Sequence, residues 1–74
     1  MALTELTILF VEDDPVFRSI VTSFLSSRGA TVVESDNGQD GLDQFKNQEF
    51  DIVIADLSIP KLGGLDMLKQ MNQH

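Results

Sequence analysis

Along the chain, short apolar runs typical of strands alternate with segments in which apolar residues recur at helical spacing. Strands are predicted at about residues 6–11, 30–35 and 50–55. The first and third are nearly continuous apolar runs rich in β-branched residues, a pattern typical of strands covered on both faces. The second is more polar, which favours a position at the edge of a sheet.

Apolar residues recur at helical spacing between and after these strands. Helices are predicted at about residues 14–28, 39–48 and 63–73. The first is the best defined, because Asp14 is a good N-cap, Pro15 suits the first helical position, and Gly29 is typical of the residue that follows a helix. The apolar stripe of this helix consists of Val16, Phe17, Ile20, Val21, Phe24 and Leu25.

The order of elements predicts the fold class. Strands that alternate with helices over short connections imply a parallel sheet with right-handed crossovers. The chain has 74 residues, enough for one small domain. We therefore expect a single α/β domain over residues 1–74 with the order βαβαβα.

Composition narrows the classes of function. Twelve acidic residues against five basic ones give a net charge of −7, and the basic residues are scattered, whereas binding to a phosphate backbone needs them clustered. We expect no direct binding of nucleic acid. The absence of cysteine excludes thiolate metal sites. The amino-terminal residues do not resemble a secretory signal and no apolar run is long enough to span a membrane, so we expect a cytoplasmic protein without membrane contact.

Three acidic residues, Glu12, Asp13 and Asp14, follow the first apolar run directly. Two carboxylates about 4 Å apart repel by about 4 kcal/mol at an effective dielectric near 20, so something must offset this cost. In an open parallel sheet, ligands gather at the carboxyl ends of the strands. If the strand order is 2-1-3, Asp56 at the end of the third strand lies beside Glu12 and Asp13. Converging carboxylates suit Mg²⁺, and a carboxylate at its edge can attack phosphorus.

The combination of these residues resembles a known family. The stretch Val11–Asp14, together with Asp56, Pro60 and Gly64, is similar to the signature of response-regulator receiver domains of two-component signalling. The segments 16–19 and 26–30 are further similar to receivers of the type found in the adaptor of the stationary-phase sigma factor. The resemblance implies a doubly wound, flavodoxin-like parallel sheet with the strand order 2-1-3.

The resemblance also implies roles for individual residues. Asp56 is expected to accept a phosphoryl group from a histidine kinase or a phosphotransfer protein and so to switch a downstream output partner. Mg²⁺ is expected to be bound directly by Asp13, by Asp56, by Glu12 through a water molecule, and by Ser58 through its backbone carbonyl. The chain is then a signalling module that phosphorylates itself and is not an enzyme.

Two features depart from the family pattern. Ile59 stands where receivers usually have methionine. Receivers also carry a threonine or serine after the fourth strand and a lysine after the fifth, and neither Lys61 nor Lys69 lies in a segment that matches. We therefore expect a truncated receiver that lacks these two strands, holds Mg²⁺ weakly and is phosphorylated poorly. Its third strand would have an unpaired edge, which favours a homodimer joined by antiparallel third strands.

Two other interpretations are open. A phosphohydrolase with an aspartate nucleophile also uses a strand-end aspartate and Mg²⁺, but it needs a second aspartate two residues later as general acid. That position is Ser58, which makes the enzyme interpretation weak. The other interpretation is a receiver-like interaction module that does not signal by phosphate.

Overall fold

The computed structural model describes residues 2–55 and 69–72 and contains one three-stranded parallel sheet. Its strands are β1 (Thr7–Val11), β2 (Thr31–Ser35) and β3 (Ile52–Ala55). The order β2-β1-β3 confirms the predicted parallel α/β fold and places β2 at an edge. Each strand begins one or two residues later than predicted.

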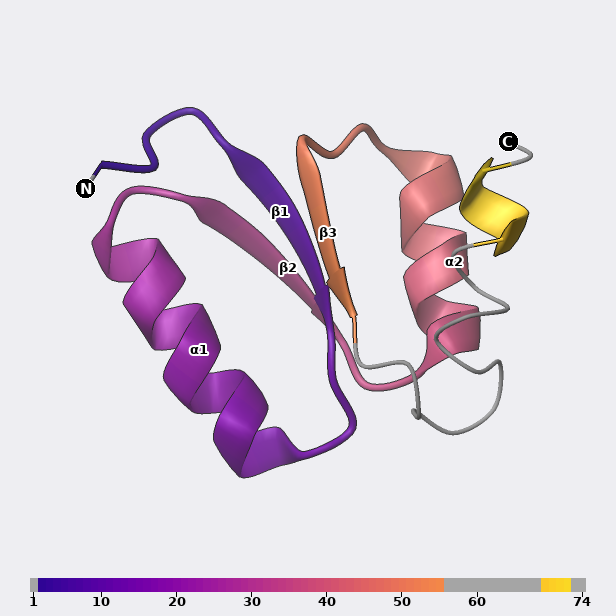
Figure 1. The fold of residues 1–74 in the computed structure, drawn as a ribbon, viewed down its shortest axis with the longest axis horizontal. Coiled ribbons are helices and arrows are strands. Elements are labelled where there is room, and N and C mark those ends of the chain that lie inside the picture. Colours follow the sequence, from indigo (N-terminus) through magenta and orange to yellow (C-terminus); the bar gives the residue numbers. More distant parts are fainter. Residues whose placement is uncertain (1, 56–68, 73–74) are drawn as a thin grey trace.

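Two helices lie on opposite sides of this sheet (Figure 1). They are α1 (Pro15–Ser27) and α2 (Gly38–Asn47). Residues 69–72 are also helical and lie beside α2 in Figure 1. They belong to the predicted helix 63–73, the rest of which lies outside the described residues.

The main core lies between the sheet and α2. Its buried residues are Leu9, Val11, Leu42 and Met71, and Val33, Phe45, Phe50, Val53 and Ala55 pack against them. Ile8 and Phe10, which alternate with Leu9 and Val11, are buried on the opposite face. The central strand β1 is therefore covered on both faces, as its apolar run predicts.

The same prediction is wrong for β3. Val53 and Ala55 pack into the α2 core, but Ile52 and Ile54 remain 40% and 37% exposed. Successive side chains of a strand point to opposite faces, and on this opposite face α1 packs on β2 and β1. A continuous apolar run shows that a strand suits burial, whereas burial itself requires an element on each side.

Helix α1 is less buried than its apolar stripe predicts. No residue of the helix is buried, and its exposed large apolar side chains are Val16, Phe17, Ile20 and Phe24. The helix contacts the sheet through partly buried residues such as Val21 and Leu25. Exposed apolar side chains thus occur on both α1 and β3.

The ends of both helices follow from their caps. Asp14 Oδ1 accepts hydrogen bonds from the N–H groups of Val16 at 2.9 Å and Phe17 at 3.2 Å, and Pro15 occupies the first turn. Gly29 has φ +100°, and a Cβ at this position would lie 3.1 Å from the Thr4 side chain. Both observations confirm the predicted ends of α1.

Helix α2 runs one residue earlier at both ends than the predicted range 39–48. The side chain of Asn37 accepts a hydrogen bond from the N–H of Asp40 at 2.9 Å. Asn37 is therefore the N-cap, and the first helical residue is Gly38.

The N-cap at Asp14 gives a test of the fold. Asp14→Ala leaves two N–H groups of α1 without their acceptor, so we expect the free energy of unfolding to fall by about 1 kcal/mol. Asp14→Ser retains an acceptor and should lose much less. Urea unfolding followed by circular dichroism measures both variants. Equal stability of the alanine and serine variants would contradict the capping role.

Candidate functional site

The carboxyl ends of β1 and β3 lie level with each other. Val11, the last residue of β1, pairs with Ala55, the last residue of β3, and with Ser35 of β2. The N–H of Glu12 donates to the carbonyl of Ser35 at 2.9 Å, which continues the contact between β1 and β2 past the end of the strand. Glu12 is thereby fixed at the carboxyl end of the sheet, where β3 also ends.

The three acidic residues after β1 have different surroundings. Glu12 is only 7% exposed, and its Oε2 accepts a hydrogen bond from the N–H of Asp14 at 3.0 Å. Asp13 is exposed, and Asp14 caps α1. The side chain of Glu12 thus bonds to the backbone of its own loop, whereas Asp13 is exposed to solvent.

The other predicted site residues, Asp56 and Ser58, lie outside the described residues, as do Ile59, Pro60 and Gly64. Among the residues that the structure describes, no group of three or more His, Cys, Asp or Glu side chains is arranged to hold a metal ion. Of the predicted ligands, the structure describes Glu12 and Asp13, which follow β1 directly and differ in exposure. Their carboxylate oxygens are hard donors of the kind that Mg²⁺ prefers.

Arg18 is part of this site and was not predicted from the sequence. Its Nη1 donates to the backbone carbonyl of Glu12 at 2.7 Å, and its Nε donates to Oε1 of Glu34 at 3.3 Å. Glu34 belongs to β2. The only signal in the sequence is that a basic residue lies one helical turn after the N-cap Asp14.

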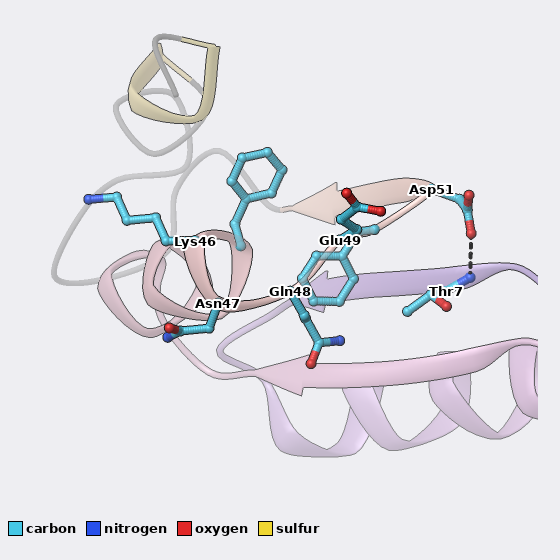
Figure 2. Close-up of a pocket in the computed structure, with 8 residues that line it drawn as sticks. Thr7, Lys46, Asn47, Gln48, Glu49 and Asp51 are labelled. Atoms are coloured by element: carbon cyan, nitrogen blue, oxygen red, sulfur yellow. Dashed lines mark hydrogen bonds between the residues drawn. The ribbon is translucent and has the colours of Figure 1, made fainter.

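A cavity lies at the opposite end of the sheet (Figure 2). Its volume is about 730 Å³, and it is lined by Thr7, Phe45, Lys46, Asn47, Gln48, Glu49, Phe50 and Asp51. Thr7 and Asp51 join β1 to the start of β3 by two hydrogen bonds of 2.8 Å. Of the predicted site residues that the structure describes, neither Glu12 nor Asp13 lines this cavity, so we assign it no part in the site.

Comparison with known families identifies the fold. A family model described as the response regulator receiver domain matches residues 8–74. This chain belongs to the receiver domain family. The match includes both strand ends of the site and agrees with the family resemblance of the acidic motif.

Individual relatives support the same assignment. The Regulator of RpoS of Escherichia coli (strain K12) is 41% identical over 64 residues, which cover 86% of this chain and 19% of that protein. The receiver domain of Ssk1 from Saccharomyces cerevisiae, solved with the histidine phosphotransfer protein Ypd1, superimposes with a TM-score of 0.92 at 26% identity. That match covers 99% of this chain and 50% of the solved chain.

The chemotaxis response regulator CheY4 of Vibrio cholerae is similar to the same extent. Its TM-score is 0.87 at 27% identity, and the match covers 90% of this chain and 56% of that chain. This receiver therefore spans about half of the solved relatives and about a fifth of the curated regulator. Within residues 2–55 and 69–72, no helix has the length and apolar character needed to cross a membrane.

The hydrogen bond inside the acidic loop gives a second test. Glu12→Ala removes the acceptor of the Asp14 N–H, so this amide should exchange with solvent about threefold to tenfold faster, in line with a net contribution of about 1 kcal/mol. Hydrogen exchange measured by NMR detects the change residue by residue. Glu5→Ala, which removes an exposed carboxylate outside the loop, is the control. Unchanged exchange at Asp14 would show that Glu12 does not hold the loop.

Proposed function

We propose that this receiver takes a phosphoryl group onto Asp56 from a histidine kinase or phosphotransfer protein, with Mg²⁺ bound by neighbouring acidic residues. The observation that carries the proposal is the register of the sheet. Val11 and Ala55, the last residues of β1 and β3, are paired, so the two strands end at the same level of the sheet. This register supports a site formed by Glu12, Asp13 and Asp56, although Asp56 itself lies outside the described residues.

The surroundings of the two described carboxylates favour different roles. Asp13 is exposed and is suited to bind the metal ion directly. Glu12 already accepts a hydrogen bond from Asp14, and a carboxylate engaged in this way is suited to hold a metal-bound water molecule. The backbone carbonyl of Ser58 completes the proposed ligands. Bound Mg²⁺ supplies positive charge next to the transferring phosphoryl group.

The chemical step is a transfer between two nucleophiles. An oxygen of the Asp56 carboxylate attacks phosphorus, the bond between phosphorus and the histidine nitrogen of the donor breaks, and the electron pair of that bond stays on the imidazole, which takes up one proton from solvent. The products are an acyl phosphate on Asp56 and an unmodified donor histidine. The protein is itself the acceptor, so the proposal includes no turnover of a separate substrate.

The class of donor is supported by one solved relative. The Ssk1 receiver was crystallised with a histidine phosphotransfer protein, and this chain superimposes on that receiver over nearly its whole length. A donor that carries phosphohistidine is therefore proposed for this chain as well. We also propose that the phosphorylated form acts on an output partner in the cytoplasm, because the similar curated proteins include regulators of transcription and of RpoS.

The phosphorylation of these 74 residues should be slow. Stabilisation of the charge on the transferring phosphoryl group is the main catalytic contribution in such sites. Receivers supply part of it from a lysine and a hydroxyl residue for which this sequence has no match.

Acetyl phosphate tests both the acceptor and the rate. We expect a small mass increase of one phosphoryl group after long incubation with Mg²⁺, measured by intact mass spectrometry, and none with Asp56→Asn or with excess EDTA. Asp43→Asn, which removes an exposed carboxylate on α2, is the control and should be labelled like the unmodified protein. Labelling that persists in Asp56→Asn would contradict the proposed acceptor, and rapid complete labelling would contradict the proposed slow rate.

We also propose that the chain forms a homodimer through β3. In the described part of the chain β3 pairs with β1 alone, and Ile52 and Ile54 are exposed. An unpaired strand edge is a template for another strand. Two copies related by a two-fold axis would join their β3 strands in antiparallel orientation and form one six-stranded sheet.

The dimer is tested by light scattering coupled to gel filtration. We expect a dimer at high protein concentration and a shift to monomer in Ile54→Lys, because a lysine at a strand edge opposes pairing. Ile20→Lys changes an exposed isoleucine of α1 and should leave the dimer intact. A monomer at every concentration would contradict the proposal, and loss of the dimer only in Ile20→Lys would move the interface to α1.

An interaction module that does not use phosphate is the second candidate function. The observation that favours it is the exposed apolar surface of α1 and β3, formed by Val16, Phe17, Ile20, Phe24, Ile52 and Ile54. Such a module would bind its partner equally well as the unmodified protein and as the Asp56→Asn variant. A receiver that depends on phosphate would lose phosphate-dependent binding in the Asp56→Asn variant.

A further inference from the structure

Arg18 joins three elements at the acidic end of the sheet. It lies in the second turn of α1, and its side chain is only 20% exposed. The Nη1 donates to the carbonyl at the end of β1, and the Nε donates to Glu34 of β2. A single guanidinium group therefore ties α1, β1 and β2 together beside the proposed metal ligands.

Arg18 is joined to the end of β1 through one carbonyl group, that of Glu12, which follows the last residue of the strand. This carbonyl belongs to the peptide bond between Glu12 and Asp13. A peptide bond is planar, so a hydrogen bond to its oxygen sets the orientation of the whole unit from the Cα of Glu12 to the Cα of Asp13. Both carboxylates extend from the two ends of that unit.

Every polar group of Glu12 is engaged in this arrangement. Its N–H donates to Ser35, its carboxylate accepts from Asp14, and its carbonyl accepts from Arg18. The first two bonds hold Glu12 itself. Only the bond from Arg18 acts on the peptide unit that leads to Asp13.

We infer that Arg18 is a positioning residue for the metal ligands: by fixing the peptide plane between Glu12 and Asp13, it directs the two carboxylates toward one cation. The inference rests on the proposed Mg²⁺ site. Arg18 touches neither the phosphoryl group nor the metal ion in this scheme and acts through the loop alone.

The chemistry of arginine explains why this residue type is needed. Its planar guanidinium presents several donors at fixed angles, so one group can reach a carbonyl and a carboxylate in different directions. Lysine carries the same charge on a single nitrogen at the end of a flexible chain. Arg18→Lys therefore preserves the charge and removes the double contact.

The sign of the effect on metal affinity separates positioning from simple electrostatics. A fixed positive charge near a cation site repels the cation, so removal of the Arg18 charge alone would tighten Mg²⁺ binding. Loss of loop orientation would weaken it. Residues that orient metal ligands from outside typically contribute tenfold or more to affinity.

The experiment compares Arg18→Lys and Arg18→Met with Arg28→Met. Arg28 is the C-cap of the same helix and lies over the ring of Phe24, 5.1 Å from its centroid, so the control removes an equal charge at the other end of α1. Mg²⁺ affinity is measured by calorimetry. We expect both Arg18 variants to weaken binding by about tenfold and Arg28→Met to leave it within about twofold. Unchanged or tighter binding in Arg18→Met would overturn the inference.

Hydrogen exchange of the metal-free variants gives the second measurement. We expect the amides of Asp13 and Asp14 to exchange several-fold faster in Arg18→Met, while that of Leu9 in the centre of β1 keeps the rate of the unmodified protein. An equal increase at all three amides would indicate general destabilisation and would overturn the positioning role.

The two measurements also separate this inference from the proposed function. If the unmodified protein does not bind Mg²⁺, the proposed site fails, and exchange at Asp13 and Asp14 still decides whether Arg18 fixes the loop. If the unmodified protein binds Mg²⁺ and the Arg18 variants bind it equally well, the site stands and the inference fails.

Discussion

The pairing of β1 with a parallel strand on each side is the constraint on which the rest of the structure depends. It places Ile8, Leu9, Phe10 and Val11 at the centre of the molecule, where all four are buried. It also brings the ends of β1 and β3 to one level. The same hydrogen-bonded register that forms the core thus sets the common level at which β1 and β3 end, and the proposed site depends on this level.

Much of the fold follows from local patterns in the sequence. Apolar runs and helical spacing indicate the strands and helices, and short connections favour a parallel sheet. The remaining errors have physical causes. The start of α2 depends on which polar residue acts as its cap, here Asn37. The exposure of Ile52 and Ile54 depends on which element covers β3, and the composition of β3 contains no information on its neighbours.

The candidate site, like the fold, was predicted from the sequence only in part. Glu12 and Asp13 are predicted as site residues from the sequence because three carboxylates after a buried strand are costly unless something compensates them. Their different burial was not predicted, since it depends on the bond between Glu12 and the N–H of Asp14. Arg18 was missed because one of its partners is a main-chain carbonyl, which the types of residue along the chain do not reveal, and the other, Glu34, lies 16 residues away in the sequence.

The start of α1 has a further consequence for the electrostatics of the acidic loop. The helix begins at Pro15, directly after the three carboxylates, and its aligned peptide dipoles place a partial positive charge at that end. The loop is thus compensated from within the fold by the dipole of α1 and by the guanidinium group of Arg18. A bound cation would add positive charge to the compensation that the helix begins.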